Sequence, residues 1–316
     1  SPGFYHHPQS VQDIIDFGLL GWAMSRYTGL WIGFKLEANV VESSATVEID
    51  PARAQPRMPD YALPPDGLHL RWPDNQVAQE HRMQAHKIYA AVAFAHANGI
   101  DRLVVDPPRA RLGIIACGKA WADLRQALAL LGIDDARAFE LGLRLYKVGM
   151  PWPLEAEGAR AFARGLDEIL VVEEKRQIIE YQIKEMLYDR PDGQRPRVVG
   201  KFDEIGEWPA PPGQWLLPPT LELDARVVAR AVAQRLARVS GDTHWQERAR
   251  ALEPRAAAPD PALARMPWFC PGCPHSRSTR VPEGSTAFGG VGCHLMAMWM
   301  DRSTLAVSQM GGEGAA

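Results

Sequence analysis

The sequence is poor in three things: cysteine, net charge and long apolar runs. Four cysteines in 316 residues are too few for a disulfide scaffold of this size. A formal net charge of −3 lacks the basic excess that is typical of nucleic-acid-binding proteins. No uncharged apolar run approaches the roughly 18 residues of a membrane span, and no cationic start with a following apolar stretch marks an export signal. We therefore expect a cytoplasmic protein that binds neither nucleic acid nor membrane.

What the sequence does have is enough apolar residues for a sizeable core, since 46% are hydrophobic and 23% are charged. A length of 316 residues predicts about two domains. The chain begins with Ser-Pro-Gly and stops within a glycine-rich stretch at residues 310–316. Because a turn needs a second element to pack against, we expect the sequence to be an internal fragment of a longer protein.

Between residues 100 and 202, short apolar runs alternate with segments of helical periodicity. Such alternation predicts right-handed crossovers and a parallel sheet covered by helices on both faces, an α/β fold. The predicted strands lie at 103–105, 112–116, 143–148, 168–172 and 197–200. The predicted helices lie at 119–131, 155–164 and 175–188.

The flanking regions predict further elements. Residues 10–29 predict a helix with Ser10 as N-cap, apolar around most of its circumference and therefore buried. Strands are expected at 30–36, 46–49 and 305–307, and helices at 78–98 and 224–238. Proline-rich composition marks residues 51–82 and 203–220 as connectors, and alanine, proline and arginine mark residues 240–266 as a linker.

The strongest chemical signal is the spacing of three cysteines near the end of the chain. Cys270 and Cys273 form a C-x2-C motif, and nineteen residues separate Cys273 from Cys293. Three thiolates so close in sequence suit a soft metal site. Three interpretations fit this spacing: zinc with His275 or His294 as fourth ligand, an iron–sulfur cluster, or thiols that bind no metal. A cluster would need a further ligand from beyond residue 316.

Other candidate residues have ordinary structural interpretations beside their functional ones. Cys117 ends a predicted buried strand, which favours a core thiol over a ligand. Glu173 to Arg176 follow another strand, where charged residues usually form a solvated boundary, although ligands also bind at that edge. The segment Met310 to Gly314 can open a diphosphate or Mg²⁺ site, or be a plain turn. The remaining histidines have no ligand-like spacing.

The sequence resembles the indolepyruvate ferredoxin oxidoreductases in their long, fused bacterial form. The resemblance rests on Phe-Cys-Pro-Gly-Cys-Pro-His at 269–275, Gly-Val-Gly-Cys-His at 290–294 and Met-Gly-Gly-Glu-Gly at 310–314. Further matching stretches lie at 21–27, 41–45, 144–149, 152–155, 171–177 and 200–203.

This resemblance implies a fold in which a parallel-sheet three-layer domain, similar to the transketolase C-terminal domain, is flanked by partial thiamine-diphosphate-binding α/β domains. Residues 1–50 would end the pyrimidine-side domain, and residues 51–99 would be a linker and helix. The three-layer domain would span 100–238. A linker at 239–265 would lead to the start of the pyrophosphate-side domain at 266–316.

The resemblance also implies a reaction. Indolepyruvate, coenzyme A and oxidised ferredoxin would give indoleacetyl-coenzyme A, CO2 and reduced ferredoxin. The implied cofactors are thiamine diphosphate, Mg²⁺ with ligands outside this chain, and a [4Fe-4S] cluster. The implied partners are ferredoxin, coenzyme A and a 2-oxoacid, and we expect a homo-oligomer. A fragment of this kind is expected to be inactive alone.

The resemblance assigns residues to these groups. Cys270, Cys273 and Cys293 would ligate the cluster, which favours the cluster over zinc. Glu313 resembles the acid of a thiamine Mg²⁺ motif, but in the family that motif comes later. The implied cofactor-binding residues lie in three short segments: Val291, Gly292, Cys293 and His294; Gly311 and Gly312; and His275.

Two rivals stay open. One is a non-catalytic α/β binding protein with a C-terminal zinc site. The other is the same chemistry on a different 2-oxoacid such as pyruvate.

Overall fold

The computed structural model describes residues 4–52, 55–191, 193–220, 222–252, 266–290 and 292–306. By its internal contacts the chain divides into two compact units, residues 1–253 and 254–316. In the described part of the chain, no helix combines the length and the apolar character needed to cross a membrane.

The first unit is built around a sheet that has five strands within the described residues. Their order is β3-β5-β4-β6-β7, and the pairs β5–β4, β4–β6 and β6–β7 are parallel. The predicted strands are therefore confirmed, with one difference. Strand β3 pairs antiparallel with β5 at the sheet edge, because it enters the sheet from a preceding helix and returns directly to β4. The strands are β3 (Arg102–Val105), β4 (Leu112–Cys117), β5 (Leu143–Val148), β6 (Glu168–Val172) and β7 (Arg197–Val199).

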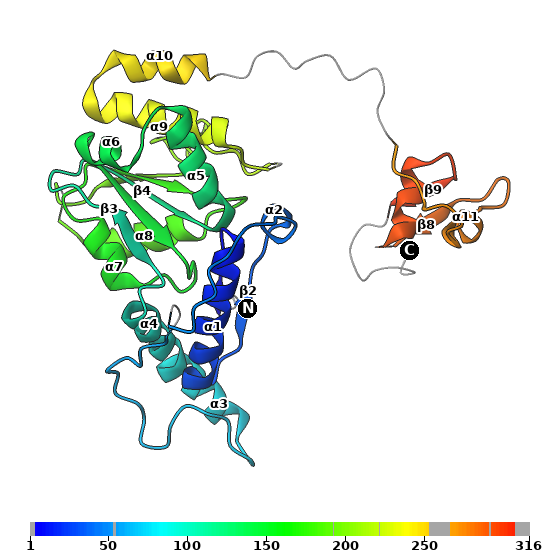
Figure 1. The fold of residues 1–316 in the computed structure, drawn as a ribbon, viewed down its shortest axis with the longest axis horizontal. Helices are drawn as coiled ribbons and strands as arrows, with labels where there is room; N and C mark the ends of the chain where they lie inside the picture. The colour runs from blue at the N-terminus through cyan, green and yellow to red at the C-terminus, as the bar shows by residue number, and fades with distance from the viewer. Residues whose placement is uncertain are drawn as a thin grey trace. The chain divides into compact units, whose positions relative to one another are not determined.

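Helices cover both faces of this sheet, as predicted (Figure 1). Every residue of β4 is buried, with Ile114 in the cluster on one face and Ile115 in the cluster on the other. One face carries α5 (Gly118–Leu130) and α9 (Ala225–Ser240), and the other carries α7 (Ala156–Phe162) and α8 (Ile179–Leu187). This is the expected three-layer α/β architecture.

Some of the described helices lie where the sequence predicted none. Helix α6 (Asp135–Glu140) is capped by Asp134, whose Oδ1 accepts a hydrogen bond from the Arg137 N–H at 2.7 Å. Helix α10 (Thr243–Ala251) lies within the predicted linker and buries Trp245 against α9. An alanine- and arginine-rich composition is typical of a linker. One face of apolar side chains is nevertheless enough for a short helix to pack on α9.

The predicted helix at the start of the chain forms as α1 (Val11–Thr28). Ser10 Oγ accepts a hydrogen bond from the Asp13 N–H at 3.2 Å, and Gly29 ends the helix with φ 68°. The prediction that α1 is buried holds for one face only, since Phe17 and Met24 are buried but Trp22 is 70% exposed. Among the described residues, the buried face packs on helix α4 (Ile88–Ala97) and on residues 32–34, with which it shares a hydrophobic cluster.

The first described strand, β1 (Phe4–His6), pairs in parallel with β2 (Ile32–Phe34) beside α1. The strand predicted at 46–49 does not form, since no strand among the described residues pairs with this segment and Ile49 stays 83% exposed. A short helix that the sequence did not predict, α2 (Ala38–Val41), precedes this segment. The helix predicted at 78–98 consists of α3 (Gln76–Arg82), a π-helical turn at Met83–Lys87, and α4.

A buried ion pair joins this N-terminal region to the sheet. Lys147 of β5 donates to Asp13 Oδ2 at 2.6 Å, and the two side chains are 2% and 11% exposed. The His7 N–H also donates to the Gly149 carbonyl at 2.9 Å, just beyond β5. Residues 4–34 and the sheet are therefore held together by polar contacts as well as by packing.

The second unit is small. Its elements are α11 (His275–Ser278), β8 (Ala287–Gly289), the 3-10 helix η2 (Cys293–Trp299) and β9 (Thr304–Ala306). Strands β8 and β9 pair in parallel, so a strand forms close to the predicted 305–307. Val307 lies outside the described residues.

Candidate metal centre

The C-x2-C motif forms a tight turn in the second unit. The Cys273 N–H donates to the Cys270 carbonyl at 3.0 Å, and Gly272 has φ 74°, which favours glycine. Cys270 is exposed and Cys273 half-buried, and neither forms a disulfide. His275 Nδ1 lies 3.2 Å from Cys273 Sγ. The turn thus presents two thiols and an imidazole close together.

The segment of Cys293 lies against this turn. The His294 and His275 rings stack with centroids 6.0 Å apart and an interplanar angle of 24°. Helix η2, which begins at Cys293, contributes Ala297 to a small core against which Cys273 packs. The structure therefore brings both cysteine segments to one place in the second unit.

The donor set fits a soft metal or an iron–sulfur cluster in its chemistry, because it offers three free thiols and two imidazoles. Among the described residues the three thiols do not lie within 4.8 Å of one another. Zinc–sulfur bonds are about 2.3 Å long, so a zinc ion bound by all three would need the segments to move closer.

Three predicted cofactor-binding residues lie outside the described part of the chain: Val291, Gly311 and Gly312. Glu313, which was not assigned as a Mg²⁺ ligand, lies outside it too. Gly292 is described and has φ 140°, and a Cβ there would lie 3.1 Å from the His294 ring. Glycine is therefore needed immediately before Cys293 for the chain to take this course.

At the carboxyl edge of the parallel sheet, Glu173 has a structural role. It is only 4% exposed, so the predicted solvated boundary is wrong at this residue. Its carboxylate accepts hydrogen bonds from the first N–H groups of α8 and the residue before it, at 2.7–3.0 Å: Ile178, Ile179 and Glu180. Burial raises the pKa of Glu173 despite these bonds. The carboxylate caps a helix whose N–H groups would otherwise be unpaired.

We expect Glu173→Ala to lower the free energy of unfolding by about 2–3 kcal/mol, because buried donors then lose their acceptor. Denaturant unfolding followed by circular dichroism measures this. Glu185→Ala, on the exposed side of the same helix, is the control and should change stability by no more than about 0.5 kcal/mol. Equal stabilities of the two variants would contradict the capping role.

Cys117 is buried, which confirms the prediction of a core thiol, and burial raises the pKa of its thiol. The sequence did not show its polar partners. Cys117 Sγ lies 3.3 Å from His7 Nδ1, and His7 Nε2 lies 3.1 Å from Glu37 Oε1. No spacing rule links residues this far apart in the chain. The raised pKa makes Cys117 a poor nucleophile and metal ligand.

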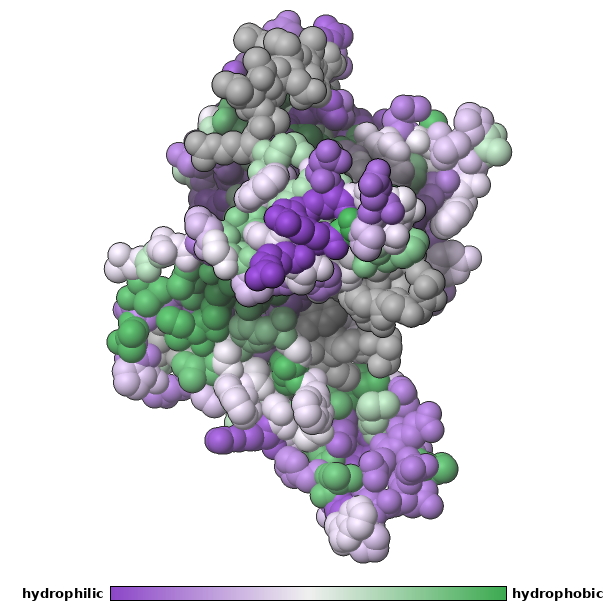
Figure 2. Space-filling model, turned by 90° about the vertical axis from the view of Figure 1, so that its right-hand side faces the viewer, coloured by the Kyte–Doolittle hydropathy of each residue, from purple (hydrophilic) through white to green (hydrophobic). Residues whose placement is uncertain are grey.

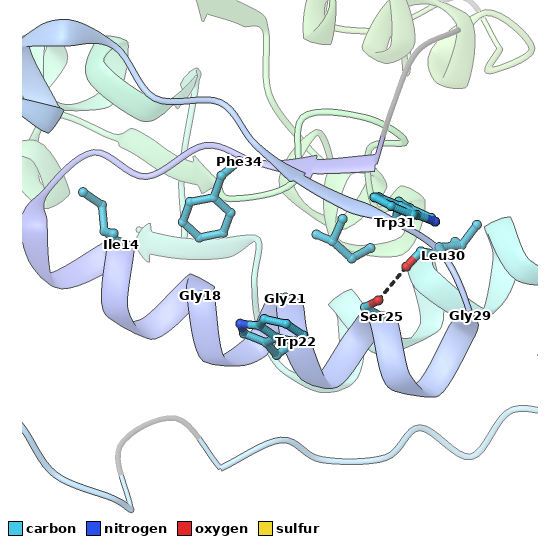
Figure 3. A pocket seen from close by; sticks show the side chains of 10 residues that line it. Ile14, Gly18, Gly21, Trp22, Ser25, Gly29, Leu30, Trp31 and Phe34 are labelled. Atoms are coloured by element: carbon cyan, nitrogen blue, oxygen red, sulfur yellow. Dashed lines mark hydrogen bonds between the residues drawn. The ribbon is translucent and has the colours of Figure 1, made fainter.

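An apolar groove of about 690 Å³ runs between α1 and β2 (Figure 3). Trp22 and Trp31 line it and are 70% and 95% exposed. The face drawn in Figure 2 likewise carries a continuous area of hydrophobic residues. Among the described residues, α1 packs on β2, and side chains from both line the groove. The groove has the character of a packing surface, since few polar groups converge in it.

Comparisons with known proteins found relatives of this sequence. Subunit IorA of the indolepyruvate oxidoreductase of Thermococcus kodakarensis is 29% identical over 194 residues, which cover 60% of this chain and 26% of that protein. IorA of Methanothermobacter marburgensis is 25% identical over 269 residues, covering 85% of this chain and 38% of that protein. The chain thus spans less than two fifths of the length of either relative.

A solved 2-oxoglutarate:ferredoxin oxidoreductase from Magnetococcus marinus has a TM-score of 0.46 and 13% identity, covering 75% of this chain and 42% of that one. No functional conclusion follows from a likeness at that level. The sequence model of the indolepyruvate ferredoxin oxidoreductase middle domain matches residues 101–258, which is half of the chain and contains the whole five-stranded sheet. This protein therefore belongs to the indolepyruvate ferredoxin oxidoreductase family.

Proposed function

We propose that this chain forms the central part of a thiamine-diphosphate-dependent 2-oxoacid ferredoxin oxidoreductase. The substrate is an aryl 2-oxoacid such as indolepyruvate, and the products are its coenzyme A thioester, CO2 and reduced ferredoxin. The observation that carries the proposal is the match of the middle-domain family over residues 101–258. The two cysteine segments that meet in the second unit support it.

In this proposal Cys270, Cys273 and Cys293 hold an iron–sulfur cluster together with a ligand from elsewhere in the whole protein. Thiamine diphosphate supplies the electron sink for decarboxylation, and the cluster supplies a one-electron route to ferredoxin. The exposure of Cys270 and Cys293 leaves their sulfurs free to bind. Gly292 allows the backbone to approach a ligand closely, because no Cβ stands in the way.

The N-terminal region has a place in the same proposal. Residues 4–34 form part of a thiamine-binding domain, and the apolar groove between α1 and β2 packs against the remainder of that domain. The exposed Trp22 and Trp31 support this, since apolar surface of this kind usually marks an interface. The relatives are also much longer than this chain.

The test uses full-length protein purified without oxygen. We expect a brown protein that contains iron and acid-labile sulfide and reduces ferredoxin when indolepyruvate, coenzyme A and thiamine diphosphate are all present. Rates with phenylpyruvate, pyruvate and 2-oxoglutarate then rank the substrates. Iron-containing protein that reduces no acceptor with any of these acids would contradict the proposed activity.

One observation favours a second candidate, a zinc-binding module without catalysis. His275 lies 3.2 Å from Cys273 Sγ, and His294 follows Cys293, so two Cys–His pairs are available. Zinc accepts such mixed ligands. A colourless full-length protein with stoichiometric zinc and no iron would support this candidate.

A further inference from the structure

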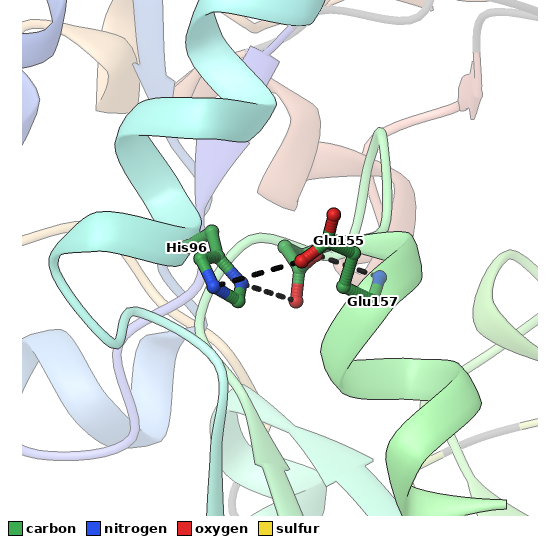
Figure 4. Close-up of side chains that lie close together, drawn as sticks. All are labelled: His96, Glu155 and Glu157. Carbon is green, nitrogen blue, oxygen red and sulfur yellow. Dashed lines mark hydrogen bonds and ion pairs between the residues drawn. The ribbon is translucent and has the colours of Figure 1, made fainter. Parts of the chain in front are cut away.

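Outside the cysteine segments, three side chains with metal-ligating atoms meet where α4 ends and α7 begins (Figure 4). His96 lies in the last turn of α4, Glu155 is the N-cap of α7, and Glu157 lies in its first turn. His96 Nδ1 is 3.4 Å from Glu155 Oε2, and His96 Nε2 is 3.8 Å from Glu157 Oε2. One ligand atom from each residue lies within 4.8 Å of the other two. A single ion can contact all three after small side-chain rotations.

The three residues differ in exposure in the way a binding site requires. The side chain of Glu155 is 5% exposed, and its oxygens accept the Glu157 and Gly158 N–H groups, each at 2.7 Å. Its orientation is therefore fixed by the fold. The side chains of His96 and Glu157 are 56% and 80% exposed, so an ion can enter and leave between them. The site thus has one ligand in a fixed orientation, Glu155, and two exposed ligands that can rotate, His96 and Glu157.

A buried hydroxyl beside Glu155 is an independent sign of a missing partner. Tyr146 is 2% exposed, and its hydroxyl has no hydrogen-bond partner among the described residues. The point where a Cβ on Gly158 would sit lies 2.4 Å from the Tyr146 hydroxyl and 2.6 Å from Glu155 Oε2. The hydroxyl and Glu155 Oε2 therefore lie no more than 5.0 Å apart without forming a hydrogen bond to each other. Buried polar groups are normally paired, and an ordered water on a bound ion would pair this one.

The local charge also favours a cation. Within the described residues, His96 makes the ion pairs of both Glu155 and Glu157, so two carboxylates share one imidazole. The carboxyl end of α4 adds the negative end of a helix dipole beside His96, and the positive end of the α7 dipole beside the two glutamates offsets it, so the two carboxylates carry the argument. One imidazole and two carboxylates form a mixed nitrogen–oxygen set that suits Zn²⁺ or Mn²⁺.

We propose that His96, Glu155 and Glu157 bind a divalent cation of this class, with Tyr146 as an outer hydrogen-bond partner. The ion joins α4 to α7 and so fastens the N-terminal helices to the sheet domain. The proposal is independent of the reaction that the whole protein catalyses.

The experiment titrates the full-length protein with Mn²⁺ and follows free Mn²⁺ by electron paramagnetic resonance. Mn²⁺ prefers oxygen and nitrogen to thiolate ligands, so the cysteine segments do not compete. We expect His96→Ala and Glu157→Gln each to weaken one Mn²⁺ site at least about tenfold. Tyr146→Phe should weaken it by roughly tenfold, as loss of an outer partner does. His244→Ala, an exposed histidine on α10, is the matched control and should keep the site.

The two ligand variants should fold, because both substituted side chains are more than half exposed. A thiamine-associated Mg²⁺ site could also bind Mn²⁺. It would bind the same amount in wild type and in every variant, so it does not affect the difference between them. A second readout is the midpoint of thermal unfolding, which Mn²⁺ should raise in the wild type and leave unchanged in His96→Ala. The same number of bound Mn²⁺ ions with the same affinities in wild type, His96→Ala and Glu157→Gln would overturn the proposal.

Discussion

Full-length protein carrying Cys273→Ser is expected to lose its iron and sulfide and, with them, all ferredoxin reduction above the rate seen without thiamine diphosphate. Serine replaces the soft thiolate that such clusters need by a hydroxyl of similar size. Cys273 is half-buried and packs against the small core of Phe269, Ala297 and Met300. Because the change in volume is small, this core should persist. Iron and sulfide analysis and a viologen-dye assay measure the two losses.

The protein contains its own control for this variant. Cys117 is also a cysteine, but it is buried in the sheet domain and contacts His7. Cys117→Ser should therefore leave the iron content unchanged. If Cys273→Ser keeps full iron and sulfide, or if Cys117→Ser loses them, the assignment of the cluster to the second unit is wrong.

Asp13→Ala should lower the free energy of unfolding by about 3–5 kcal/mol, because it leaves the buried Lys147 ammonium without its partner. The Lys147 side chain is 2% exposed and its Nζ lies 2.6 Å from Asp13 Oδ2. Burial lowers the pKa of Lys147, and the Asp13 carboxylate opposes that shift. The variant also loses the acceptor of the Gln9 N–H at the start of α1. Denaturant unfolding near pH 7 measures the loss.

The double variant Asp13→Ala/Lys147→Met separates the ion pair from the other effects. It should recover a large part of the loss, because no buried charge is then unpaired. In the single variant the pKa of Lys147 falls further, so the unfolded state binds more protons than the folded state as the pH rises. The loss should therefore be smaller near pH 9 than near pH 7. A double variant that is no more stable than the single one would show that the buried charge is not the cause.

Much of the fold is predictable from local patterns. Strand β4 is a continuous apolar run, β6 is apolar after Glu168, and β5 is mostly apolar with Arg144 and Lys147 between its apolar residues. Each of the three forms within one residue of its predicted bounds. Capping residues set the start and end of α1, with Ser10 before it and Gly29 after it. These predictions succeed because periodicity and capping depend on residues only a few positions apart.

The wrong predictions all depended on partners that local patterns do not show. The strand expected at 46–49 had the right residue types but no partner strand in the part of the chain that the structure describes. Helix α10 forms because Trp245 packs against α9, and composition alone does not show this contact. Helix α1 has an exposed apolar side because nothing described in this chain covers it. Glu173 was predicted to lie at a solvated boundary, but its carboxylate accepts a hydrogen bond from the Ile179 N–H at the start of α8.

The sequence by itself determined the α/β class, the strand runs of the central sheet and the spacing of Cys270, Cys273 and Cys293. Only the tertiary structure decided which side chains meet. Lys147 reaches Asp13 across 134 positions, Cys117 reaches His7 across 110, and His96 meets Glu155 from a different helix. The physical reason is that hydrophobic periodicity fixes which face of an element is buried, whereas polar contacts between elements depend on how those faces finally pack.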